Sequence, residues 1–115
     1  MKTHLIKLEE LLPSIQAQLL TDSTQVDIGG CYISDLLSDV LARAQPGVLW
    51  VTVQTHRNVV AVAATKDIAA VLFACDRKPE ASIIAEAEEQ GIALLSTSLT
   101  TYEAAGKLWE AGLRE

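Results

Sequence analysis

The chain has 115 residues, of which half are apolar and 21% are charged, so a disordered tail is excluded and one domain with an ordinary core is expected. Nine basic residues stand against 15 acidic ones, without a Lys/Arg cluster, which argues against a nucleic-acid-binding protein. No run approaches the ~20 apolar residues of a membrane span. Glu9 and Glu10 interrupt the segment where a signal peptide would be apolar, so we expect a cytoplasmic protein.

The N-terminal quarter predicts a short helix followed by a strand. Thr3 is a candidate N-cap, and the leucines after it recur at helical spacing as far as Pro13, which cannot continue a helix. Residues 15–19 then alternate apolar and polar side chains, which favours a half-buried strand, although a continued helix is also compatible.

The next segment predicts a strand at residues 26–33 and a helix at residues 34–44. Gly29-Gly30 suggests either a bulge within that strand or a close approach of another backbone segment. Ser34 is a candidate cap for the helix, whose expected buried stripe consists of Leu36, Leu37, Val40 and Leu41.

From residue 48 onward, strands and helices alternate regularly. Strands are predicted at residues 48–53, 70–75 and 92–96. The helices between and after them are predicted at 58–64, from Pro79 to just before Gly91, and from the capping box of Thr100 and Glu103 to near Gly112.

This alternation predicts a single α/β domain over residues 1–115, a three-layer α/β/α fold with a mostly parallel sheet of five or six strands. Residues 69–74 are apolar at every position, as expected of a strand covered on both faces. The two earlier strands are expected to add at an edge, in an orientation that the sequence leaves open. Cys31 and Cys75, which form no CxxC pair, are expected to be small buried residues.

Ligands of open α/β sheets usually sit beyond the carboxyl ends of the strands. Hydroxyl groups, cations and helix N-termini would gather there, which favours an anion. The candidate ligand-binding residues are Ser34, Asp35, Thr52, Gln54, Thr55, His56, Arg57, Asn58 and Thr97.

The roles of His56 and of the pair Asp35 and Asp39 remain open. His56 fits a loop histidine bonded to its own turn, a ligand contact, or a general base that would need an orienting carboxylate. Asp35 and Asp39 lie four residues apart, so on one helix they could hold Mg²⁺ together, but a solvated acid and a helix-dipole acid are the ordinary alternative, and we predict no metal site.

Familiar catalytic motifs are absent from the sequence. It contains no GxxxxGK[ST] loop, no GxGxxG and no GxSxG elbow. We therefore expect a protein that is not an enzyme, with a small hydrolase or transferase that uses His56 as a minor alternative.

Residues 32–42 (YISDLLSDVLA) and 49–63 (LWVTVQTHRNVVAVA) resemble the stand-alone DRTGG-domain proteins of anaerobic bacteria. That group is similar to the N-terminal domain of HPr kinase/phosphorylase and to modules of phosphotransacetylases and CBS-containing pyrophosphatases. The resemblance implies a regulatory or dimer-forming role in a hydrogenase or anti-sigma-type signalling setting, and the missing phosphate loop argues against inheriting a kinase function.

The chain departs from the motif that names the group. His56-Arg57 stands where the group has Asp-Arg, so only Arg57 carries over. Ala74-Cys75-Asp76 stands where Thr-Gly-Gly would follow the next strand.

Two functions of different classes follow as expectations. The first is a non-catalytic sensing module that binds an adenine nucleotide or another small anion and self-associates as a homodimer. The second is a docking module without a small ligand, whose partner is a kinase-like or hydrogenase-associated protein; Trp50 and Trp109 would then supply interface surface, unless both lie in the core.

Overall fold

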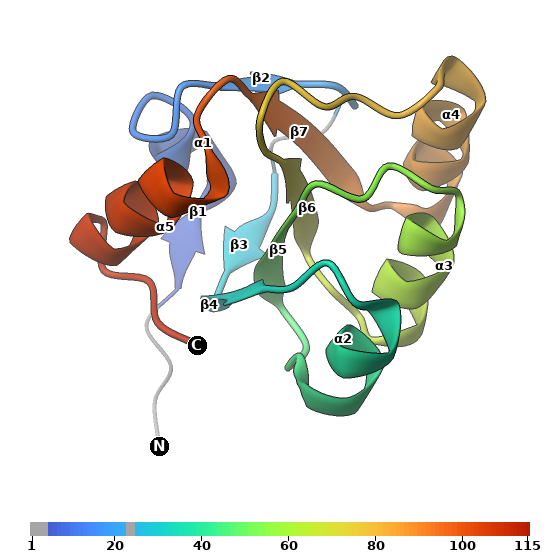
Figure 1. Ribbon diagram of the computed structural model, residues 1–115, viewed down its shortest axis with the longest axis horizontal. Helices are drawn as coiled ribbons and strands as arrows, with labels where there is room; N and C mark the ends of the chain where they lie inside the picture. The colour runs from blue at the N-terminus through green and yellow to red at the C-terminus, as the bar shows by residue number, and fades with distance from the viewer. Residues whose placement is uncertain (1–4, 23–24) are drawn as a thin grey trace.

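The computed structural model describes residues 5–22 and 25–115, and two layers of helices enclose a five-stranded sheet (Figure 1). Helices α2, α3 and α4 lie on one face, and α5, α1 and a small two-stranded ribbon lie on the other. The elements are β1 (Ile6–Lys7), α1 (Leu8–Leu11), β2 (Ala17–Leu19), β3 (Asp27–Ile28), β4 (Gly30–Ile33), α2 (Leu37–Arg43), β5 (Val48–Thr52), α3 (Asn58–Thr65), β6 (Ala70–Phe73), α4 (Ala81–Gln90), β7 (Ala93–Thr97) and α5 (Thr101–Glu110).

The sheet order is β2-β7-β6-β5-β4. Strands β4 to β7 are parallel and follow one another in chain order, whereas β2 joins β7 in antiparallel orientation. This arrangement confirms the predicted three-layer fold with a mostly parallel sheet. Within the described residues, no helix is long and apolar enough to cross a bilayer.

The central strands are buried at every position, as their unbroken apolar sequence predicts. Successive side chains point to opposite faces, so Trp50 and Phe73 pack under α2, α3 and α4, while Leu49 and Leu72 pack under α1 and α5. Covering both faces in this way leaves the ends of the strands as the place where polar loops can gather.

The predicted helix ends of the second half are confirmed. Gly91 follows α4 in the left-handed conformation, with φ of 73°. Thr100 and Glu103 form the reciprocal capping box of α5. Helix α4 begins at Ala81 rather than Pro79, within the first turn of the predicted position.

The N-terminal prediction is only partly right. Ile6–Lys7 is a strand that pairs with β3, so the helix is shortened to the four residues of α1. Thr3, its predicted cap, lies outside the described residues. Residues 17–19 form a strand, as the alternation favoured.

The single strand predicted at residues 26–33 is wrong. The chain divides at Gly29, whose N–H donates to the carbonyl of Gly47 at 2.9 Å. Strand β3 pairs with β1 in the ribbon, and β4 continues into the main sheet beside β5. The chain therefore changes sheets here instead of bulging within one. The close backbone approach expected at these glycines is present, because a Cβ at Gly30 would lie 2.5 Å from the carbonyl oxygen of Arg114.

The predicted packing of α2 is also corrected. Val40 is fully buried, but Leu36 and Leu41 are 65% and 43% exposed. Ser34 does not cap the helix, which begins at Leu37; its hydroxyl oxygen accepts a 3.2 Å hydrogen bond from the N–H of Leu36 in the preceding turn. Helix α2 therefore covers the edge of the sheet through a narrow apolar contact.

Candidate functional site

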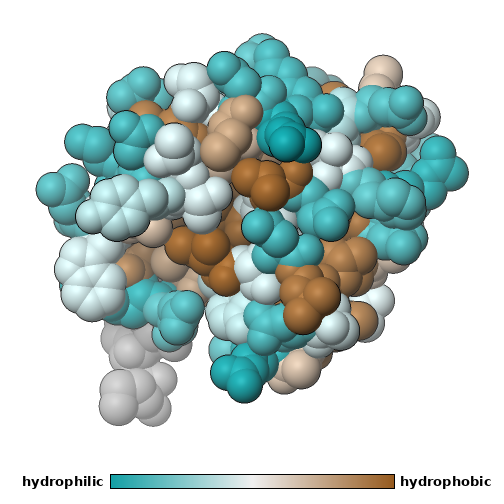
Figure 2. All heavy atoms as spheres, viewed as in Figure 1, coloured by the Kyte–Doolittle hydropathy of each residue, from teal (hydrophilic) through white to brown (hydrophobic). Residues whose placement is uncertain are grey.

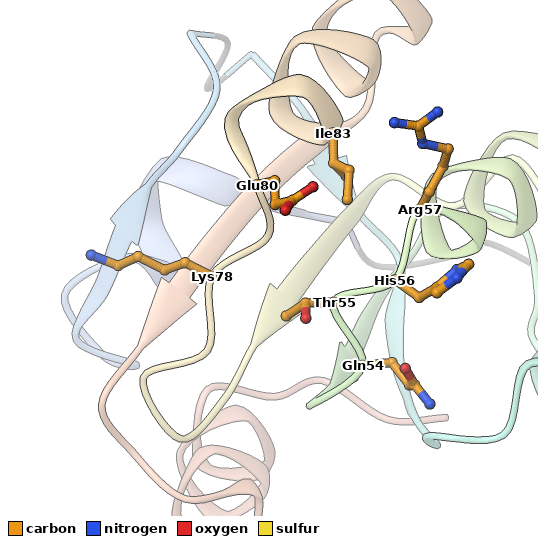
Figure 3. Close-up of a pocket in the computed structure, with 7 residues that line it drawn as sticks. All are labelled: Gln54, Thr55, His56, Arg57, Lys78, Glu80 and Ile83. Carbon is orange, nitrogen blue, oxygen red and sulfur yellow. The ribbon is translucent and has the colours of Figure 1, made fainter.

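The carboxyl ends of β5 and β6 lead into a shared hollow at the N-terminal ends of α3 and α4 (Figure 3). Its volume is about 660 Å³. It is lined by Gln54, Thr55, His56, Arg57, Lys78, Glu80 and Ile83. The parallel pairing of β5 with β6 explains why loops twenty residues apart meet here.

The side chains of the hollow differ in direction (Figure 3). Arg57 extends from the start of α3 toward α4, and Glu80 and Ile83 point into the space between the two segments. Lys78 stands at the rim and extends outward. The hollow therefore combines a cation, a carboxylate and an apolar wall within one open depression.

Its electrostatics favour an anion near Arg57. In the part of the chain that the structure describes, neither Arg57 nor Lys78 takes part in an ion pair. The N-terminal ends of both helices add partial positive charge to the hollow. No side chain caps α4, whereas the first N–H of α3 donates to the ring of His56. Glu80 opposes this charge on one wall and offers an acceptor for a hydroxyl or amino group.

His56 is exposed at the same edge. Its Nδ1 accepts a 3.1 Å hydrogen bond from the N–H of Asn58, the contact expected of a loop histidine that stabilises its own turn. This bond fixes the orientation of the ring and leaves Nε2 as the nitrogen available to a ligand.

Asp35 connects the ends of β4 and β5. Its Oδ1 accepts hydrogen bonds from the Thr52 hydroxyl at 2.8 Å and from the Val53 N–H at 2.9 Å. Thr52 Oγ1 in turn accepts from the N–H of Gln54 at 3.0 Å. Asp35 and Thr52 thus hold the loop that enters the hollow, and they are absent from its lining.

The structure corrects the predicted relation between Asp35 and Asp39. Asp35 precedes α2, so the two carboxylates do not share a helix face. Asp39 accepts from the Tyr32 hydroxyl at 2.7 Å and pairs with Arg43 at 3.5 Å. The bond from Tyr32 is the main cause that holds the pKa of Asp39 below its ordinary value. Among the described residues, no group of three metal-ligating side chains is assembled.

The turn after β6 has an unusual backbone. Cys75 and Asp76 both have φ of 60°, and the N–H of Arg77 closes the turn on the carbonyl of Ala74 at 3.2 Å. The N–H of Cys75 donates to Leu99 at 2.8 Å, tying this turn to the one after β7. Cys75 is exposed, which corrects the expectation that both cysteines are buried, whereas Cys31 is buried.

The structure brings four of the nine predicted ligand-binding residues into the hollow, namely Gln54, Thr55, His56 and Arg57. Asn58 contributes only its N–H, to His56, and Asp35 and Thr52 hold the loop that leads into the hollow. Ser34 is absent from the lining and bonds the N–H of Leu36. Thr97 is separate: its buried hydroxyl donates to the carbonyl of Ile15 at 2.7 Å.

The candidate residues did not include Lys78, Glu80 and Ile83, which complete the lining of the hollow. The available signal was Pro79, which marked a helix start beside the neighbouring strand end.

Comparisons with known proteins agree with this architecture. The crystal structure of the CBS and DRTGG domains of the regulatory region of Clostridium perfringens pyrophosphatase, complexed with its activator diadenosine tetraphosphate, matches with a TM-score of 0.74. The match covers 89% of this chain and 45% of that chain, so the chain spans less than half of its neighbour. At 12% identity, the likeness is one of fold. No curated protein matches the chain. The DRTGG domain model matches residues 10–111, nearly the whole length, and the chain therefore belongs to the DRTGG domain family.

Proposed function

We propose that this protein is a non-catalytic regulatory domain that senses a small phosphate-bearing ligand, such as an adenine nucleotide, in the hollow between α3 and α4. One observation carries the proposal. Arg57 lines a hollow at the N-terminal ends of two helices, of which α4 has no side-chain cap, and among the described residues this arginine takes part in no ion pair. A phosphate group would bind the guanidinium and the uncapped N–H groups at the start of α4 together.

The remaining lining fits a nucleotide better than inorganic phosphate. Glu80 offers a carboxylate to a sugar hydroxyl or a base amino group, and Ile83 offers apolar surface to a base. A bare phosphate would meet the repulsion of Glu80 without using its acceptor. The structural neighbour, a regulatory region complexed with diadenosine tetraphosphate, adds support for a nucleotide.

The contacts of His56 favour binding over catalysis. A general base usually has one ring nitrogen oriented by a carboxylate, whereas Nδ1 of His56 accepts from the backbone of Asn58. Asp35, the carboxylate considered as its partner, is bonded to Thr52 and Val53. His56 therefore fits a ligand-contacting or turn-stabilising residue.

A thermal-shift screen tests the proposal. Purified protein is heated with adenine and guanine nucleotides, diadenosine tetraphosphate, pyrophosphate and phosphate. A ligand at 100 times its dissociation constant adds about 2.7 kcal/mol to stability, a rise of roughly 10 °C for a domain of this size. A saturable rise with a nucleotide, larger than that with phosphate, is the expected result.

Arg57→Ala and Arg77→Ala form a matched pair for locating the site. Both arginines are exposed and lie after neighbouring strands, but only Arg57 lines the hollow. Loss of a charged hydrogen bond should weaken binding about 10- to 100-fold in Arg57→Ala and leave Arg77→Ala unchanged. Equal responses of the two variants would show that the ligand does not bind in this hollow. If no compound raises the melting temperature, a protein-docking role is favoured instead.

A further inference from the structure

Helix α5 exposes aromatic side chains along one face. Of the five aromatic residues in the chain, Trp50 and Phe73 are buried, but Tyr102 and Trp109 are 88% and 62% exposed. At helical spacing they share a face with Ala105 and Gly106. Over α5, at the left of Figure 2, large ring-bearing side chains of intermediate hydropathy stand out from the surface. Exposed aromatic residues are enriched at protein interfaces.

Trp109 is held in one position before any partner arrives. The Arg114 guanidinium stacks 3.5 Å from the centre of the indole ring. The same guanidinium donates to the carbonyl of Trp109 at 3.0 Å and to that of Leu113 at 2.8 Å. One face of the ring is thereby covered and the side chain loses little further freedom on binding, which is the property of an interface anchor.

Gly106 has no evident purpose within its own chain. A glycine inside a helix costs about 1 kcal/mol relative to alanine. A Cβ added at Gly106 would meet nothing within 4 Å, so the fold leaves room for a side chain. Gly106 lines an open hollow of about 570 Å³ together with Tyr102 and charged residues of the same helix, and its lack of a side chain would let a second backbone approach α5 closely.

We propose that α5 is a self-association surface, on which a second copy of this chain docks its own α5 in antiparallel orientation. The order aromatic, small, small, aromatic at positions 102, 105, 106 and 109 is symmetric about its centre. A two-fold axis that passes between Ala105 and Gly106 places Trp109 of each copy against the partner's Tyr102 and the hollow beside it. The same contact therefore forms two times in the dimer. Such self-complementarity defines an isologous dimer interface.

The charges on the flank of the stripe fit the same arrangement. Glu103, Lys107 and Glu110 lie on one side of it. In the antiparallel pair, Lys107 lies near the partner's Glu103, and Glu110 lies near the positive N-terminal end of the partner's helix. Because the charges of α5 complement those of a second α5 in antiparallel orientation, they favour another copy of this chain over an unrelated protein.

This surface is independent of the proposed ligand site. Helix α5 packs on the opposite face of the sheet from α3 and α4 (Figure 1). Failure of ligand binding therefore leaves the dimer proposal standing, and the reverse also holds.

Sedimentation equilibrium of the full chain, from low to high micromolar concentration, tests the proposal. We expect a reversible dimer. Gly106→Leu places a side chain in the hollow at a position where a Cβ meets nothing within 4 Å, and Trp109→Ala removes the anchor, so each should raise the dissociation constant at least about tenfold. Ala85→Leu, which adds the same side chain at an exposed position of α4, is the matched control and should leave the dimer unchanged.

Circular dichroism melts of the three variants check that each remains folded. A wild-type chain that stays monomeric throughout this range overturns the proposal. A dimer that is not weakened by Gly106→Leu also overturns the proposal, whatever the effect of Trp109→Ala. A dimer weakened equally by Gly106→Leu and Ala85→Leu would likewise exclude α5 as the specific surface.

Discussion

The carbonyl oxygen of Arg114 accepts a 2.9 Å hydrogen bond from the backbone N–H of Cys31, so the end of the chain closes over the edge of strand β4. The contact is possible because position 30 is glycine: a Cβ there would lie 2.5 Å from the same carbonyl oxygen. The tail partly covers the edge strand of the sheet, which would otherwise present unpaired backbone groups to other chains.

Gly30→Ala should therefore destabilise the protein. The added methyl group must displace backbone, so we expect a loss of about 1–3 kcal/mol in urea denaturation. Gly106→Ala is the control, because a Cβ there is unobstructed and alanine favours a helix. In dilute protein it should gain up to about 1 kcal/mol. Equal stabilities of Gly30→Ala and wild type would show that the tail leaves β4 in solution.

The pair formed by Tyr32 and Asp39 predicts a pH dependence of stability. The hydrogen bond lowers the pKa of Asp39 and raises the pKa of Tyr32. Asp39 stabilises the fold above its unfolded pKa, and this contribution is lost as pH falls through the lower folded value. The Tyr32 contribution is present below its unfolded pKa and is lost as pH rises through the higher folded value.

Tyr32→Phe removes both contributions. Its destabilisation, measured by urea denaturation, should be largest near neutral pH and smaller at strongly acidic pH, where Asp39 is protonated in both states. Tyr102→Phe changes an exposed hydroxyl and is the control. A Tyr32→Phe effect that is independent of pH would mean that packing of the ring, not the bond to Asp39, is what the substitution disturbs.

Asp35 should matter both for stability and for the loop that enters the hollow. Asp35→Ala leaves the Thr52 hydroxyl and the Val53 N–H without their acceptor, at a cost of about 1–3 kcal/mol. Because the same loop carries Gln54, we expect ligand-induced stabilisation to fall as well. Asp35→Asn keeps an acceptor oxygen and should restore most of both properties. If Asn behaves like Ala, the charge rather than the hydrogen bonds is what the loop requires.

The central elements of this fold were predictable because their signals are local. An unbroken apolar run specifies a strand covered on both faces, and the Thr100–Glu103 pair specifies a helix start. The errors arose where tertiary context decides. Two-residue strands such as β1 carry almost no pattern, and the apolar spacing of α2 does not reveal that Leu36 and Leu41 face solvent at the sheet edge.

The hollow was predictable only in part for a similar reason. The loop at residues 54–57 could be placed at a strand end, but Glu80 and Ile83 enter the hollow because β5 and β6 are neighbours. Neighbouring strands are a property of the assembled sheet. Thr97 shows the converse, since it lies at the carboxyl end of a strand but its hydroxyl donates to the carbonyl of Ile15 and not to a ligand site.

The turn at Cys75 and Asp76 provides a last prediction. Both residues adopt φ of 60°, a conformation that costs a side-chain-bearing residue about 1 kcal/mol and glycine almost nothing. By the resemblance described above, they stand where the family motif has its glycines, the residues that adopt this conformation most readily. Cys75→Gly and Asp76→Gly should each stabilise the protein by about 0.5–1 kcal/mol, part of the gain being offset by the freer unfolded chain.

Arg77→Gly, the neighbouring exposed position outside the left-handed pair, should instead lose stability and is the control. Urea denaturation measures all three variants. If Cys75→Gly lowers stability, the thiol makes a contact that outweighs the backbone strain. If both glycine variants gain stability and keep the nucleotide response, the side chains at this turn are dispensable for sensing. If they gain stability and lose the response, Cys75 or Asp76 contributes to the ligand site despite its cost to the fold.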